Sequence, residues 1–159
     1  IRDRVYYCCA QSSLVPNRFF AMESARNRIM GVLMYLYGIK GFLHWGYNFY
    51  NSKFSLHPVD PYRVTHADYA FPSGDPFLVY PGPDGAPLSS VRAEVQDDAL
   101  LDLRALQLLE QLAGRAFVEE LIYADAEMRP MTFRDYPRGA GYLLALRERV
   151  AAEIESRLA

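Results

Sequence analysis

The chain has 159 residues, of which 51% are hydrophobic and 14% aromatic, and its formal net charge is only −2. This length suits one domain with a hydrophobic core, and the near-neutral charge gives no electrostatic reason to expect binding to nucleic acid or to an anionic membrane. No apolar run approaches the roughly 18 residues that a membrane-spanning helix needs.

The first part of the chain predicts two short strands separated by a helix. Residues 4–10 are rich in β-favouring side chains and predict a buried strand. Apolar residues then recur at spacings of three and four between about 19 and 37, which predicts a helix that ends at Gly38. Residues 41–45 predict the second strand.

The second part of the chain begins with a long irregular segment, residues 47–75, which contains three prolines. Loops of this length inside compact domains are usually functional. The apolar residues 77–80 predict a third strand, which we expect to be parallel and buried on both faces. Two adjacent serines precede residues 91–113, and one of them is the expected N-cap of a strong helix. The composition of residues 140–158 predicts a final helix.

This order of elements is an α/β pattern with parallel strands and crossover helices. A sheet of about three strands would leave much of its edge backbone unpaired. We therefore expect the C-terminal portion of a larger (β/α)8 TIM barrel, with any targeting segment lying upstream. Residues 1–115 are expected to form the last strands and helices of the catalytic barrel, and residues 116–159 a helical extension packed on it.

Four residues are assigned no chemistry. Cys8 and Cys9 are neighbours in a predicted strand, where successive side chains point to opposite faces, so they are poorly placed to pair. Neither has another metal ligand at a recognised spacing, and we expect no metal site and no cofactor. Asp75 and Asp84 lie among glycines and prolines and are interpreted as turn residues.

The stretch from Gly41 to Tyr50 passes from an apolar strand into a cluster of aromatic and amide side chains. In barrels of this kind, the loops after the strands carry the reactive groups. Trp45 is the expected platform for the apolar face of a sugar ring, and Asn48 is the expected hydrogen-bond partner of its polar rim. Tyr47, at the same strand exit, can hold a substrate oxygen. Core packing or a loop-capping role is the alternative for each.

Three further residues are candidates for the substrate pocket. Tyr80 follows the third predicted strand, where its phenol can contact substrate or form part of the wall. His44 alternates with Trp45, so at most one of them points to the barrel axis, and a buried, hydrogen-bonded histidine is the favoured alternative. Arg92 lies in the first turn of a helix, where a cation is unfavourable. We expect it to pair with a carboxylate, either Glu94 or one upstream, or to contact substrate.

Several uncommon motifs occur in order along the chain and resemble the C-terminal half of glycoside hydrolase family 123 and its uncharacterised close relatives. The resemblance reaches to about Leu112 and is carried by residues 42–48, 71–82 and 89–94, with Tyr7-Cys8-Cys9 and Asn17-Arg18. It implies a barrel enzyme that removes terminal β-linked N-acetylgalactosamine from glycans. Members are expected to use substrate-assisted retaining hydrolysis, in which the acetamido oxygen of the sugar attacks the anomeric carbon.

In that family an adjacent Asp-Glu pair orients the acetamido group and acts as general acid and base. No adjacent Asp-Glu occurs in this chain. The resemblance therefore implies that the pair lies upstream, that no catalytic residue is present here, and that the chain alone is inactive. Its partners would be a glycan or small saccharide and the N-terminal remainder of the same barrel.

Three functional hypotheses remain open at this stage. The leading one is the substrate-binding half of a glycoside hydrolase barrel. The second is a carbohydrate-binding or interaction module without catalysis, and the third is a barrel enzyme of different chemistry that shares only the scaffold. The residues do not define a compartment, although secretion or a periplasmic location would suit an enzyme that degrades polysaccharides.

Overall fold

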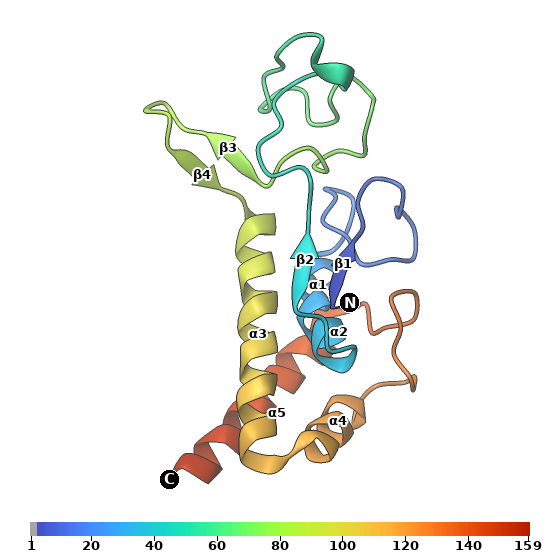
Figure 1. The fold of residues 1–159 in the computed structure, drawn as a ribbon, viewed down its shortest axis with the longest axis vertical. Coiled ribbons are helices and arrows are strands. Elements are labelled where there is room, and N and C mark those ends of the chain that lie inside the picture. Colours follow the sequence, from blue (N-terminus) through green and yellow to red (C-terminus); the bar gives the residue numbers. More distant parts are fainter. Residues whose placement is uncertain (1–2) are drawn as a thin grey trace.

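The computed structural model describes residues 3–159 as a mixed α/β fold with few strands and several helices. Strands β1 (Arg4–Tyr6) and β2 (Gly41–Leu43) form a parallel pair in which Val5 lies opposite Phe42. Helices α1 (Ser24–Arg28) and α2 (Met30–Leu36) connect them and lie behind the sheet in Figure 1. The predicted strand–helix–strand order is therefore confirmed, with shorter strands and a helix divided at Ile29.

The third predicted strand is not a parallel strand. Strand β3 (Val79–Pro81) pairs antiparallel with β4 (Pro87–Ser89), and this hairpin projects beyond the start of α3 in Figure 1. The expectation of about three parallel strands was wrong because residues 82–86 form a tight turn, closed by a hydrogen bond of 2.8 Å from Gly82 N to Ala86 O. So short a connection can join antiparallel strands but not parallel ones. The apolar run reflects burial of Phe77 and its neighbours, not strand direction.

The predicted helices of the second part are confirmed. Helix α3 (Val91–Ala113) begins at Ser90, whose hydroxyl accepts a hydrogen bond of 3.3 Å from Ala93 N. Helices α4 (Arg115–Tyr123) and α5 (Ala140–Leu158) follow, and none of the helices in residues 3–159 has the length and apolar character needed to cross a bilayer. One short 3-10 helix, η1 (Lys53–Ser55), lies in the long loop.

The main hydrophobic core lies where α2 packs among α3, α4 and α5. Helix α2 is buried along nearly its whole length, from Met30 to Tyr35. A Cβ atom on Gly31 would lie 1.9 Å from the carbonyl oxygen of Ala99, so only glycine allows α2 and α3 to approach this closely. The C-terminal helices share this core through Val118, Ile122, Leu143, Leu146 and Val150.

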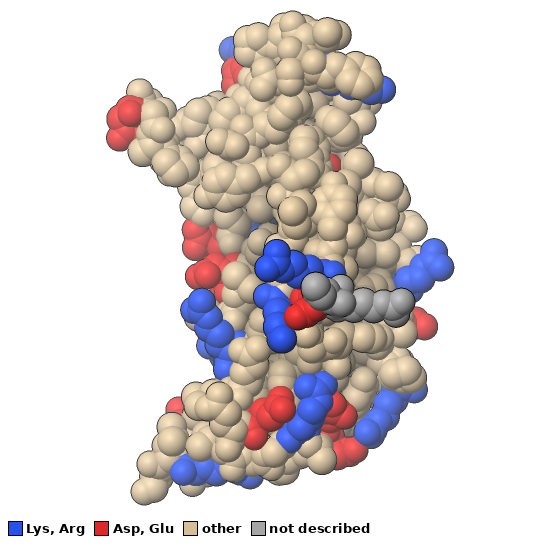
Figure 2. All heavy atoms as spheres, viewed as in Figure 1, with Lys and Arg blue, Asp and Glu red and all other residues tan. Residues whose placement is uncertain are grey.

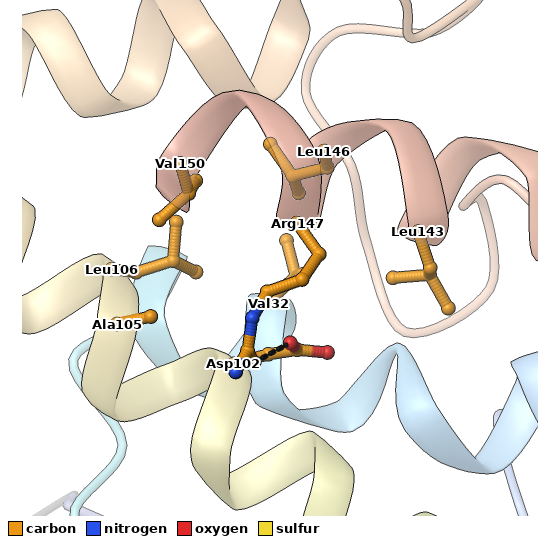
Figure 3. Close-up of a pocket in the computed structure, with 8 residues that line it drawn as sticks. All are labelled: Val32, Asp102, Ala105, Leu106, Leu143, Leu146, Arg147 and Val150. Atoms are coloured by element: carbon orange, nitrogen blue, oxygen red, sulfur yellow. Dashed lines mark hydrogen bonds and ion pairs between the residues drawn. The ribbon is translucent and has the colours of Figure 1, made fainter. Parts of the chain in front are cut away.

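A buried carboxylate ties three helices together around this core. Asp102 of α3 is 7% exposed and receives Arg28 Nε of α1 at 2.6 Å and Arg147 Nη1 of α5 at 2.5 Å. Figure 3 shows Arg147 reaching across to Asp102 beside Val32 and Leu106. The cavity there has a volume of about 10 Å³, enough for one water molecule at most, so it is a packing defect and not a ligand site.

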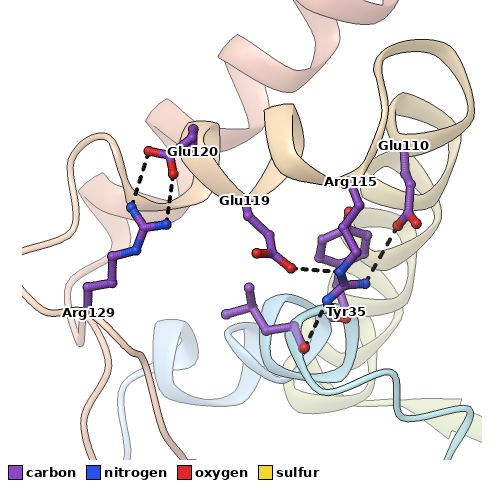
Figure 4. Close-up of polar contacts among 7 residues, drawn as sticks. Tyr35, Glu110, Arg115, Glu119, Glu120 and Arg129 are labelled. Carbon is purple, nitrogen blue, oxygen red and sulfur yellow. Dashed lines mark hydrogen bonds and ion pairs between the residues drawn. The ribbon is translucent and has the colours of Figure 1, made fainter.

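A second arginine joins α4 to the end of α2. Arg115 donates to Leu36 O at 2.9 Å, and its guanidinium lies 4.8 Å from the centre of the Tyr35 ring (Figure 4). The pair of Arg129 and Glu120 in the same view is exposed and contributes little to stability. The tertiary position of α4 thus depends on Arg115 and on apolar packing.

The long segment between Tyr47 and Asp75 lies at the upper end of the molecule in Figure 1. On the face drawn in Figure 2, the region that it forms with the hairpin carries few charged side chains, whereas most charges gather over the lower half. Several of its aromatic side chains, including Phe54 and Tyr69, are exposed. This end, which carries few charges on the face drawn in Figure 2, adjoins the residues that follow the two parallel strands.

Candidate functional site

Polar side chains gather where β1 and β2 end. Because the two strands are parallel, their C-terminal ends lie at the same edge of the sheet, and the loops that follow, residues 7–18 and 44–50, meet there. Residues from these two loops are joined by Asp75, from the end of the long segment. We call this group the polar cluster, and its members are Asn17, Arg18, His44, Trp45 and Asp75.

Arg18 is the buried cation of the polar cluster and is only 1% exposed. Its Nη1 atom lies 3.1 Å from His44 Nδ1 and 3.3 Å from Asn17 Oδ1. The guanidinium also packs 4.5 Å from the centre of the Phe42 ring. Burial lowers the pKa of Arg18, because the charged form loses hydration that these contacts only partly replace.

The neighbours of His44 define its protonation state. A guanidinium only donates, so Nδ1 of His44 accepts the hydrogen bond from Arg18. Its Nε2 atom then carries the proton and donates to the carbonyl oxygen of Asp75 at 3.1 Å. Burial, followed by the charge of Arg18, lowers the pKa of His44 to about 3. His44 is therefore a neutral bridge between Arg18 and Asp75, which is the favoured structural alternative from the sequence and not a titrating acid or base.

Asp75 is fully buried, with 0% exposure, although the sequence pattern suggested an ordinary turn residue. Its Oδ2 atom accepts a hydrogen bond of 2.8 Å from the indole nitrogen of Trp45. Burial raises the pKa of the Asp75 carboxyl, while the hydrogen bond from Trp45, the nearby charges of Arg18 and Arg92 and the backbone N–H of Cys9 oppose this shift. Asp75 thus fixes the orientation of Trp45 and offers no exposed atom to a ligand.

Trp45 is half-buried, and two phenylalanines support its ring. Its centroid lies 4.7 Å from that of Phe71 and 5.2 Å from that of Phe49, both in tilted arrangements. With its indole nitrogen held by Asp75, the ring has a single well-defined orientation. The part of the ring that remains accessible is a rigid aromatic surface at the strand exit.

Tyr47 and Asn48 lie beside Trp45, and both side chains are exposed. Their backbone is fixed, because Tyr47 O accepts from Leu78 N at 2.8 Å and Asn48 forms an isolated antiparallel bridge with Phe77. No hydrogen bond joins the Asn48 amide group to another side chain among residues 3–159. Both side chains are therefore available to a ligand that rests on this edge.

Tyr80 and Arg92 form a neighbouring group at the base of the hairpin. The Tyr80 ring stacks on Tyr62, with centroids 5.0 Å apart. Arg92 Nη1 donates to Gly74 O at 2.6 Å and to Arg18 O at 3.2 Å, and these backbone contacts tie α3 to the polar cluster. Pairing of Arg92 with Glu94, one of the alternatives that we considered, is not present, because the guanidinium turns towards these carbonyl groups.

The structure thus connects three of the six predicted site residues, His44, Trp45 and Arg92, through two residues that the sequence analysis did not select, Arg18 and Asp75. Both had a detectable signal. Arg18 follows a loop that leaves a strand, and Asp75 lies two residues before the third predicted strand. Their burial was not visible in the pattern because it depends on contacts between distant segments.

Cys8 and Cys9 differ from the strand residues that we expected. Strand β1 ends at Tyr6, and the chain then turns, with Gln11 N donating to Cys8 O at 3.0 Å. The alternation of a strand no longer applies, and the two Sγ atoms lie 3.6 Å apart. Within residues 3–159, no group of three or more His, Cys, Asp or Glu side chains is arranged to hold a metal ion.

Comparison with curated proteins gives no match for this chain. The catalytic domain of glycoside hydrolase 123, in contrast, matches residues 2–109. The matched range includes both parallel strands, the whole polar cluster, the hairpin and most of α3, and it ends before α4. This match confirms the resemblance found in the sequence: the chain belongs to glycoside hydrolase family 123, and the match is to the catalytic domain of that family.

Proposed function

We propose that this chain forms the sugar-binding side of a glycosidase that removes terminal β-linked N-acetylgalactosamine by substrate-assisted retaining hydrolysis. Family membership supports a glycoside hydrolase, and the choice of sugar and mechanism is our proposal. The Asp-Glu pair that would orient the acetamido group and transfer the proton is absent from the chain. A segment upstream of the matched residues would supply it.

The observation that carries this proposal is the fixed Trp45 ring at the exit of β2. A sugar has an apolar C–H face and a polar rim, and a rigid aromatic ring binds the former at low entropic cost. Trp45 is oriented by Asp75 and flanked by the exposed side chains of Tyr47 and Asn48, which can contact the hydroxyl or acetamido groups. Tyr80 and Arg92 would form the adjoining wall.

We further propose that the parallel pair of β1 and β2 belongs to a (β/α)8 barrel. Parallel sheets are normally paired at their edges and covered on both faces. Here Tyr6 and Leu43 are exposed, and an open groove of about 430 Å³ runs along β2, lined by residues that include Arg4, Phe42 and His44. Further strands of the same catalytic domain would cover this surface, with residues 1–115 in the barrel and residues 116–159 as its helical extension.

The test is hydrolysis by the full-length parent protein. Three aryl substrates are compared, the β-N-acetylgalactosaminide, the β-galactoside and the β-N-acetylglucosaminide. We expect release from the first alone, because the substrate-assisted route needs the acetamido group and the pocket selects the galacto configuration. Equal release from the β-galactoside would exclude the substrate-assisted route. Release from none of the three by folded protein would remove the proposed activity.

The absence of an Asp-Glu pair within the chain favours one other function, a non-catalytic carbohydrate-binding module. The two functions differ in what the parent protein does with a ligand that it binds. Trp45 is the only tryptophan of this chain, so its fluorescence reports on the site. Quenching of this chain's fluorescence by N-acetylgalactosamine, without any hydrolysis by the parent protein, would support the binding module, whereas quenching together with hydrolysis supports the enzyme.

A further inference from the structure

The adjacent cysteines lie in a tight turn next to the polar cluster. Cys8 N donates to Gln11 Oε1 at 3.0 Å, and Gln11 N donates to Cys8 O at 3.0 Å. Residues 8–11 therefore form a turn that is closed by two hydrogen bonds. The two thiols point to the same side, with their sulfur atoms 3.6 Å apart. A disulfide bond needs about 2.05 Å, so the two sulfur atoms are already close and must approach further for the bond to form.

We propose that Cys8 and Cys9 are a redox modification site, at which a reversible vicinal disulfide forms and alters the polar cluster. The co-reactant is a small-molecule disulfide of the glutathione type. The thiolate of Cys9, the more accessible of the two, attacks that disulfide, forms a mixed disulfide and releases one thiol. Cys8 then attacks the Cys9 sulfur, forms the Cys8–Cys9 bond and releases the second thiol. The two cysteines lose two electrons and two protons, which the small disulfide gains.

The proposed bond is of the labile kind. Adjacent Cα atoms across a trans peptide are about 3.8 Å apart, whereas disulfides usually join Cα atoms about 4.4–6.8 Å apart. A bond between neighbours is therefore strained, and strained disulfides are readily reduced, as regulatory ones are. Its formation is also slow at neutral pH. Burial, with Cys8 and Asp75 nearby, raises the pKa of the Cys9 thiol to about 11, and only the thiolate attacks.

A chain of contacts connects the turn to the polar cluster. Asn17 Nδ2 donates to Cys8 O at 3.0 Å, while Asn17 Oδ1 accepts from both the backbone and the guanidinium of Arg18. The backbone N–H of Cys9 also contributes to lowering the pKa of the carboxyl of Asp75, the residue that accepts the hydrogen bond from Trp45. Closing the ring between adjacent residues distorts the peptide that joins them, and so it displaces both the Cys8 carbonyl and the Cys9 N–H.

This proposal is independent of the sugar and of the reaction, and the chain offers a direct test. It contains only two cysteines, so any intramolecular disulfide must join Cys8 to Cys9. The protein is incubated with glutathione disulfide, alkylated and digested with trypsin, which releases residues 5–18 as one peptide. We expect this peptide to lose the mass of two hydrogen atoms, to resist alkylation, and to regain two reactive thiols after treatment with dithiothreitol. Two alkylated cysteines, a stable glutathione adduct or a disulfide-linked dimer would each overturn the proposal.

Single substitutions separate the two steps of the reaction. In Cys8→Ser, the residue that resolves the mixed disulfide is missing, so we expect a glutathione adduct to accumulate on Cys9. Cys9→Ser should form no vicinal bond. The fluorescence of Trp45 measures the effect on the polar cluster: we expect a reversible shift when the wild type is oxidised and none in Cys9→Ser. Unchanged fluorescence despite complete disulfide formation would refute the connection to Trp45.

Discussion

The role of Asp75 as the residue that holds Trp45 gives the sharpest test of the site. Asp75→Ala removes the acceptor at 2.8 Å from the indole nitrogen and a negative charge that interacts with Arg18 and Arg92. Hydrogen bonds to charged groups contribute about 1.5–3 kcal/mol, and removing one partner of a buried charged group costs about 3–5 kcal/mol. We therefore expect Asp75→Ala to lower the free energy of unfolding by about 3–5 kcal/mol.

Asp75→Asn separates the hydrogen bond from the charge. The amide oxygen can still accept from Trp45, but Asp75→Asn, like Asp75→Ala, removes the negative charge near Arg18 and Arg92. Asp75→Asn should therefore be less destabilising than Asp75→Ala by about 1 kcal/mol, the net contribution of the hydrogen bond that it keeps. The matched control is Asp84→Ala, an exposed turn aspartate that caps Ala86 N, for which we expect a change within about 0.5 kcal/mol.

The assay is urea unfolding followed by the fluorescence of Trp45, the only tryptophan. In Asp75→Ala the emission of the folded state should also change, because the indole loses its partner. An unfolding midpoint of Asp75→Ala equal to that of Asp84→Ala, with unchanged emission, would show that Asp75 does not hold the ring. The structural basis of the proposed sugar platform would then be lost.

Three other predictions follow from the contacts. Asp102→Ala should destabilise the protein by about 3–5 kcal/mol because two arginines lose a buried partner, whereas the half-exposed Asp98→Ala should cost at most about 1 kcal/mol in urea unfolding. Since the folded-state pKa of His44 is lowered from 6.5 to about 3, its contribution to stability is present above pH 6.5 and declines as the pH falls towards 3. The stability difference between wild type and His44→Gln should shrink over that range, and a constant difference would contradict the assignment. A Cβ on Gly46 would lie 2.2 Å from a backbone oxygen, so Gly46→Ala should weaken sugar quenching of fluorescence, whereas Gly139→Ala, which has open space around it, should not.

Local sequence signals predicted much of the fold because they act within one element. The helix at residues 91–113 has its capping serine, its apolar face and a following glycine, and it forms over that range. The first two strands and their parallel pairing were also predicted, although β1 ends at Tyr6 because the chain turns at Cys8. The third strand was assigned the wrong direction, since an apolar run indicates burial and the turn at residues 82–86 decides how the chain returns.

The candidate site divides in the same way. By itself, the sequence determined that aromatic and amide side chains follow the second strand, and it contains the motifs of glycoside hydrolase family 123. Only the tertiary structure decided that Asp75 is buried and holds Trp45, and that Arg18 fixes the tautomer of His44. The physical reason is that each of these hydrogen bonds joins two residues separated by 26 to 31 positions in the sequence. Such residues meet only once the two parallel strands have paired and their C-terminal ends lie at one edge of the sheet. Composition and local spacing do not distinguish Asp75, which the fold buries, from Asp84, which stays exposed in its turn.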